Sequence, residues 1–134
     1  MKPSFTFFCD ANSSMGMGHY SRCKRVAKAI SHHCKKLCNI SFQGDLKPRL
    51  REEVVSLDWK YLNKNAALDR IPNHIAIFDS YTITQSDLDY ITSQHHANVF
   101  IDDFNRHDFS NIDLVVNFRF GYNIDDYNVK KLEK

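Results

Sequence analysis

The sequence has few of the features that mark membrane, nucleic-acid-binding or secreted proteins. No apolar run approaches the length of a membrane span. The 18 lysines and arginines against 16 acidic residues leave a net charge of only +2, which gives no support for a nucleic-acid or membrane-surface partner. Residues 1–4 lead straight into a strand-like run, so we expect no secretory signal. The four cysteines are then expected to be reduced thiols of a cytoplasmic protein.

Glycine is also scarce, and its distribution is informative. Only four glycines occur in 134 residues, and two of them, Gly16 and Gly18, fall between an apolar run and a helix-like pattern. The third glycine of the dinucleotide-binding fingerprint is absent, which argues against a nicotinamide cofactor. We expect no cofactor.

The hydrophobic pattern predicts strands alternating with helices. Strands are expected at 4–9, 38–42, 75–78, 98–101 and 114–116, with a weaker one at 54–57. Helices are expected at 20–30, 46–53 and 84–94, the last capped by Thr84, whereas 59–68 is expected to be helical or irregular. This order predicts an α/β fold, a Rossmann-like parallel sheet with helices on both faces, over residues 1–121, followed by a polar tail at 122–134.

Polar side chains follow the predicted strands where each one ends. Because the carboxyl ends of parallel strands meet at one edge, where open α/β sheets bind ligands, we expect these residues to share a site with the glycine loop. They are Asp10, Asp79, Tyr81, Asp102, Asp103 and Asn117.

The segment from Gly16 to His19 predicts an anion site beside a titratable group. Glycines at a strand-to-helix crossing either only close the turn or let the backbone approach a ligand, the interpretation that we favour, and helix N-terminal amides favour an anion. His19 is then a candidate general base, with a structural histidine as the alternative. Arg22 is expected to pair with a phosphate or with Asp10, or else to be solvated.

The other candidates each have a functional and a structural interpretation. Asp10 either caps its loop or orients His19 or a water molecule, and Tyr81 either points its hydroxyl into the cleft or is ordinary surface. Outside the site, His95 is expected at an exposed helix end and His74 in a loop.

Two pairs of residues raise the question of a metal. Cys34 and Cys38 have a spacing found in some zinc sites, but no second ligand pair follows, and a helix end leading into a strand explains them as well. Asp102 and Asp103 suit a divalent cation or, alternatively, a turn or helix cap. We predict no metal site.

Four segments carry a resemblance to a known family. They are residues 10–23, with the Gly-x-Gly-His loop, 75–81, with Asp-x-Tyr, 99–103, ending in Asp-Asp, and 113–117, ending in Asn. In this order they resemble the UDP-sugar hydrolases of the pseudaminic-acid pathway. Relatives of that family include the spore-coat polysaccharide proteins and, more distantly, the lipid-linked UDP-GlcNAc transferases of the GT-B class.

The resemblance implies the N-terminal half of a GT-B fold and an inverting, metal-independent hydrolysis of a UDP-2,4-diacetamido-2,4,6-trideoxyhexose, in nonulosonic-acid or surface-polysaccharide biosynthesis. His19 would activate water, assisted by Tyr81 and Asp10. Residues expected to contact the nucleotide-sugar substrate are Ser14, Gly16, Met17, Gly18, Arg22, Asp79, Asp103 and Asn117. A C-terminal half that binds UDP would act in cis or in trans.

One position departs from the family pattern, and two other functions stay open. Phe8 stands where family members commonly carry an arginine, two residues before Asp10. The alternatives are a GT-B glycosyltransferase domain, whose histidine activates an acceptor hydroxyl, and a non-catalytic module that binds a sugar or a protein partner.

Overall fold

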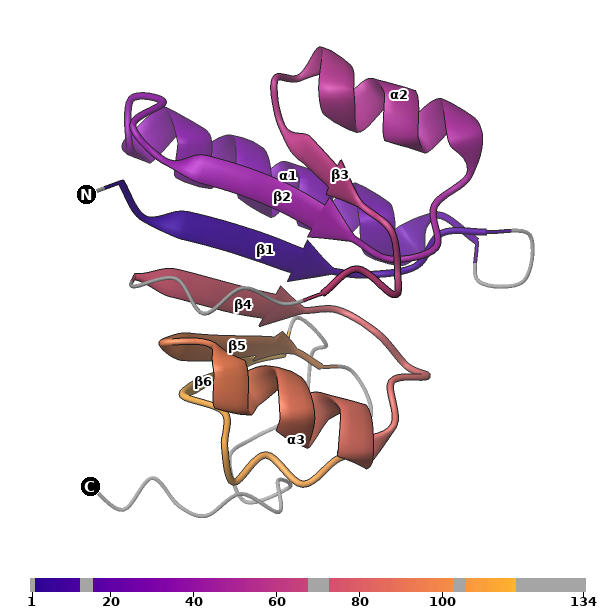
Figure 1. Ribbon diagram of the computed structural model, residues 1–134, viewed down its shortest axis with the longest axis vertical. Coiled ribbons are helices and arrows are strands. Elements are labelled where there is room, and N and C mark those ends of the chain that lie inside the picture. The colour runs from indigo at the N-terminus through magenta and orange to yellow at the C-terminus, as the bar shows by residue number, and fades with distance from the viewer. Residues whose placement is uncertain (1, 13–15, 68–72, 103–105, 118–134) are drawn as a thin grey trace.

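The computed structural model describes residues 2–12, 16–67, 73–102 and 106–117. Within them a single parallel sheet has the strand order β3-β2-β1-β4-β5-β6 (Figure 1). The strands are β1 Ser4–Phe8, β2 Asn39–Gln43, β3 Lys60–Leu62, β4 His74–Phe78, β5 Ala97–Ile101 and β6 Leu114–Val116. The helices are α1 Gly18–His33, α2 Pro48–Ser56 and α3 Gln85–Gln94. This architecture confirms the predicted Rossmann-like α/β fold.

Helices cover both faces of the sheet. Successive side chains of a strand point to opposite faces, so Phe7 packs in the cluster with α1 and α2, whereas Phe8 packs in the cluster beneath α3. Figure 1 shows α1 behind the sheet and α3 in front of it. The crossover helices thereby bury both faces of the central strands, as a parallel sheet requires.

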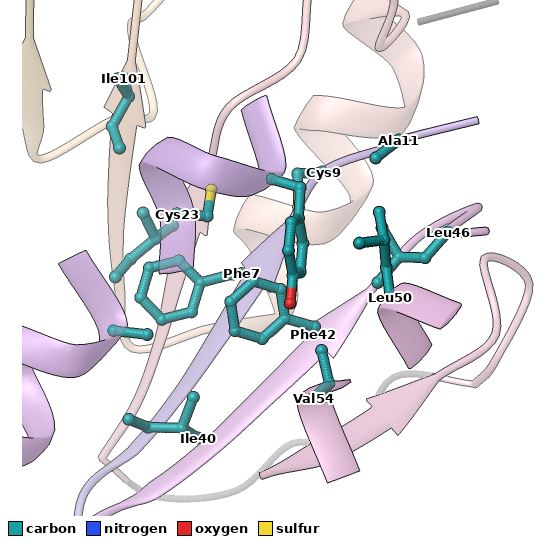
Figure 2. Packing of buried hydrophobic residues seen from close by; sticks show 13 residues of the cluster. Phe7, Cys9, Ala11, Cys23, Ile40, Phe42, Leu46, Leu50, Val54 and Ile101 are labelled. Carbon is teal, nitrogen blue, oxygen red and sulfur yellow. The ribbon is translucent and has the colours of Figure 1, made fainter. Parts of the chain in front are cut away.

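The larger core is organised around Phe42, which is fully buried on β2 (Figure 2). Its ring stacks on Phe7 at 5.1 Å and on Trp59 at 5.5 Å, measured between ring centroids. Tyr20 of α1 packs against it at 5.7 Å and donates a 2.5 Å hydrogen bond to Glu53 of α2. Burial, followed by that hydrogen bond, raises the pKa of Tyr20. The aromatic cluster therefore holds α1 and α2 together on one face.

The structure corrects two predicted elements. The strand expected at 54–57 is wrong, because α2 continues to Ser56, with Val54 buried against the core and Val55 exposed to solvent. The helical or irregular interpretation of 59–68 is wrong at Lys60–Leu62, which forms the edge strand β3. A proline at the start of α2 fits the first turn of a helix, where no backbone donor is needed.

Other boundaries agree with prediction to within a few residues. The Thr84 cap of α3 is confirmed, because its hydroxyl accepts a 3.1 Å hydrogen bond from the Asp87 amide. Residues 118–134 lie outside the described residues, and with them the expected boundary at 121 and the polar tail. Among the described helices, none is both long and apolar enough to cross a membrane.

Two histidines expected at the surface or in a loop are instead buried against each other. His74 lies within β4, and its ring shares a 2.6 Å hydrogen bond with the Thr6 hydroxyl. His95 lies at the end of α3, and its ring donates a 2.8 Å hydrogen bond to the carbonyl of Ile91. Their ring centroids are 4.3 Å apart. Burial is the main cause that lowers the pKa of His95, and His74 contributes in the same direction.

We expect acid to destabilise the protein partly through His95. An unfolded histidine titrates near pH 6.5, and the folded one titrates lower, so the unfolded chain binds the proton first. The free energy of unfolding should therefore decrease as the pH falls below about 6.5. Urea unfolding at several pH values should show a shallower decrease for His95→Gln than for the wild type. If the free energy of unfolding decreased equally with pH in both proteins, His95 would not be a cause of the destabilisation by acid.

Candidate functional site

The site lies where the two central strands end. β1 and β4 are neighbours, but β1 leads through α1 toward one edge of the sheet and β4 leads through α3 toward the other. At such a reversal of strand order, α/β proteins bind ligands in a crevice outside the carboxyl ends of the two strands, so we expect the site between β1 and β4.

The loop after β1 is fixed to the loop after β2. The Ala11 amide donates a hydrogen bond to the Asp45 carbonyl, and the Ala11 carbonyl accepts one from the Lys47 amide, each with an N–O distance of 2.9 Å. The Asp10 carboxylate accepts a 2.8 Å hydrogen bond from the Asp45 amide, and Asn12 donates to the Asp45 side chain at 2.8 Å. Asp10 therefore organises its loop. The aspartate that contacts His19 is Asp79.

The glycine loop begins α1 without a side-chain cap. Gly16 has φ +69°, a conformation that favours glycine, and Gly18 is the first residue of the helix. Met17 makes no side-chain capping bond, and the first turn contains no acidic residue. A Cβ added at Gly16 or Gly18 would meet no described atom within 4 Å. Packing of the described residues therefore does not require glycine at position 18, and the backbone there is open to a ligand.

This opening gives a prediction for Gly18→Ala. Because the added methyl group meets open space and alanine favours helix over glycine, the free energy of unfolding should be unchanged or higher by up to about 1 kcal/mol. If a ligand approaches the backbone here, its binding should weaken at least fivefold. Thermal unfolding and titration with a UDP-sugar measure the two effects. Unchanged binding would show that position 18 stays clear of the ligand.

His19 and Asp79 form the centre of the site. Both side chains are buried, and His19 Nδ1 lies 2.5 Å from Asp79 Oδ1. An ionised carboxylate can only accept, so in the neutral imidazole this contact places the proton on Nδ1 and leaves the lone pair on Nε2. A carboxylate that orients an imidazole in this tautomer is the arrangement used for general-base catalysis.

Arg22 completes the arrangement one turn along α1. Its Nε donates to Asp79 Oδ2 at 2.6 Å and its Nη2 donates to Oδ1 at 2.7 Å. This bidentate pair compensates the charge of a carboxylate with no exposed surface, and it restrains the plane of the carboxylate. Through these atoms Arg22 contacts Asp79 and not Asp10, which was one of its predicted partners.

Tyr81 and Cys23 border this centre. The Tyr81 ring meets the His19 ring edge-on, with centroids 4.2 Å apart. Tyr81 is 39% exposed, so it covers part of the imidazole while itself contacting solvent. The Cys23 thiol lies 4.0 Å from Asp79 Oδ2. A hydrogen bond with Cys9, followed by burial, raises the pKa of Cys23 well above its usual value, which favours the thiol over the thiolate.

The remaining candidates follow the outer strands or are not described. Asn117 follows β6, two strands from β4, and the buried Asp102 bonds through its backbone amide to Val116. Ser14 and Asp103 lie outside the described residues. Over 2–12, 16–67, 73–102 and 106–117, no three histidine, cysteine or acidic side chains gather in a way that could hold a metal ion.

The sequence did not identify the role of Asp79 at His19. Asp79 was expected only among the residues that contact substrate, and its pairing joins positions 60 residues apart. The sequence does show an acidic residue directly after the apolar run that forms β4. This signal points to His19 only once β1 and β4 are known to be neighbours.

Comparison of the chain with models of protein families finds no match, and comparisons with curated proteins and with solved structures find none either.

Proposed function

We propose that this chain is the sugar-binding domain of a UDP-sugar hydrolase-like enzyme. Its substrate would be of the UDP-2,4-diacetamido-2,4,6-trideoxyhexose type, in nonulosonic-acid or surface-polysaccharide biosynthesis. The observation that carries the proposal is the 2.5 Å contact between His19 Nδ1 and the buried Asp79 carboxylate at the crevice between β1 and β4. The resemblance of the loop from Gly16 to His19 supports the choice of substrate class.

In the proposed reaction, His19 Nε2 takes a proton from water. The water oxygen bonds to the anomeric carbon of the sugar, the bond from that carbon to the phosphate oxygen breaks, and UDP leaves with the bonding pair. Asp79 stabilises the imidazolium that forms, as a buried carboxylate does beside a catalytic histidine. The open backbone at Gly18, at the positive end of α1, would lie against the diphosphate.

The proposal includes a second unit and a compartment. A UDP-binding half, in cis or in trans, would close the site from the opposite side. A cytoplasmic location fits the four cysteines, all of which are free thiols in the structure.

Hydrolysis in ¹⁸O-labelled water tests the function. The chain is incubated with the UDP-sugar, alone and with a UDP-binding half added, and the products are analysed by mass spectrometry. We expect the label on the anomeric hydroxyl of the sugar. Label on UDP, UDP release only when an acceptor alcohol is added, or no turnover in either mixture would each contradict the proposal.

The matched variants are His19→Gln and His96→Gln. Loss of a general base typically reduces a rate by about 10²- to 10⁴-fold, and we expect a decrease in this range for His19→Gln. His96 is exposed, and its substitution should leave the rate unchanged. Thermal unfolding of both variants shows whether the buried position tolerates the change.

A further inference from the structure

A cavity lies on the α3 side of the strand ends. It is a groove of about 380 Å³, bordered by Phe8 at the end of β1, by the segment after β3 and by α3. Gln43 holds one wall in place, because its side-chain amide donates a 3.1 Å hydrogen bond to the carbonyl of Ala66. The volume is at the small end of the range for ligand pockets.

The turn after β4 separates this groove from His19 by a single residue. Ser80 and Thr82 line the groove, whereas Tyr81 between them packs on the His19 ring. The turn is held by the Ser80 hydroxyl, which accepts hydrogen bonds from the amides of Thr82 at 3.2 Å and Ile83 at 3.1 Å. A ligand of a few rings could therefore place one part in the groove and another beside the imidazole.

The lining combines apolar surface with neutral polar groups. Phe8, Ile83 and Ile91 supply apolar surface, and Tyr90 adds an aromatic ring that is 60% exposed. Hydroxyl and amide groups on the rim can donate and accept hydrogen bonds. They belong to Asn65, Ser80, Thr82 and Thr84. A pyranose ring has matching chemistry, with apolar C–H faces and a perimeter of hydroxyl or acetamido groups.

The charges along the groove disfavour an anionic ligand. Among the described residues that line it, Asp10 and Asp87 carry carboxylates and Lys64 is the one cation. The contrasting surface lies between α1 and α2, where one acid, Glu53, is accompanied by four cations. They are Lys24, Arg25, Lys28 and Arg49. The described side chains of the groove therefore favour a diphosphate less than the surface between α1 and α2 does, whereas an uncharged ring is not affected by this difference.

We propose that the groove bordered by Phe8, Ile83, Tyr90 and Ile91 binds the neutral sugar ring of the substrate. The ring lies against Tyr90, and its anomeric carbon points past the turn after β4 toward His19. This assignment rests on the proposed function for the identity of the substrate, and it gives the groove the role of selecting an uncharged sugar.

Titration of the ¹⁵N-labelled full chain with two monosaccharides tests the assignment. The probes are N-acetylglucosamine, which is neutral, and glucuronate, which has a similar ring and a negative charge. We expect N-acetylglucosamine to shift the backbone amides of Asn65, Thr82 and Tyr90, and glucuronate to bind at least fivefold more weakly. Shifts confined to other regions, equal affinity for both sugars, or no shift at 100-fold excess over millimolar protein would overturn the assignment.

Variants locate the contact. Tyr90→Ala removes the exposed ring and should weaken binding of N-acetylglucosamine about fivefold. Thr82→Trp should block the groove from an exposed turn, and Leu37→Ala, which removes a 65% exposed side chain elsewhere, should change nothing. Equal affinities for all three variants would overturn the assignment.

This experiment requires neither turnover nor a UDP-binding half. Sugar binding in the groove without hydrolysis of any UDP-sugar would contradict the proposed function and leave the groove assignment standing. Hydrolysis of the UDP-sugar with no sugar-induced shift in the groove would overturn the groove assignment and leave the proposed function standing.

Discussion

Asp79→Asn is expected to reduce the proposed hydrolysis of a UDP-sugar by about 10³- to 10⁴-fold, the size of effect known for the equivalent change in a catalytic triad. Asparagine has nearly the same shape, but its amide group can donate to His19 Nδ1, which then accepts and leaves the proton on Nε2. Such an imidazole has no lone pair directed at water. The expected change is therefore in kcat, with little change in KM.

Two comparisons separate this effect from a loss of structure. Asp79 also holds Arg22, so Asp79→Asn should be somewhat less stable, and activity is measured well below its unfolding temperature. Asp113→Asn is the matched control, because Asp113 bonds to the Asn98 amide at 2.7 Å on the outer strands, away from His19. A rate for Asp79→Asn within tenfold of that of Asp113→Asn would refute a role of Asp79 in catalysis.

Phe42→Ala is expected to reduce the free energy of unfolding by about 3–5 kcal/mol, the usual effect of removing a fully buried aromatic ring. The cavity would open between Phe7 of β1, Tyr20 of α1 and Trp59 in the loop before β3, which cannot all move to fill it. With total stabilities of about 5–15 kcal/mol for domains of this kind, the variant should be largely unfolded in mild denaturant.

Urea unfolding followed by circular dichroism measures this loss. Val55→Ala is the matched control, because it removes a 61% exposed side chain next to the buried Val54 on the same helix. Its effect should stay within about 0.5 kcal/mol, as for most surface substitutions. A loss below about 1 kcal/mol for Phe42→Ala would contradict the central place of this ring in the core.

Most of the fold could be predicted because the central strands have clear patterns. The apolar runs before Asp10 and Asp79 and the alternation at 38–42 coincide with β1, β4 and β2. The errors occur where local pattern is ambiguous. Val54 and Val55 look like strand residues because they are β-branched, yet only one of them faces the core. β3 has three residues at the sheet edge, too few for periodicity to detect.

Less of the candidate site could be predicted. The glycine loop and the side chains at strand ends follow from local sequence, since they depend on short motifs and on the topology of parallel sheets. The pairing of His19 with Asp79 depends on the register of β1 beside β4 and on the rotation of α1, which are set by packing over the whole core. The same holds for the burial of His95 against His74, because burial is a property of the assembled layers.

The tautomer of His19 tests the central claim most directly. In a chain labelled with ¹⁵N-histidine, long-range proton–nitrogen correlation spectra at pH 8 distinguish the two neutral tautomers, and His19→Gln assigns the signal. We predict a proton on Nδ1 and an unprotonated Nε2 in the wild type, because Asp79 accepts from Nδ1. A proton on Nε2, or an identical spectrum for Asp79→Asn, would contradict the role of His19 as a base oriented by Asp79.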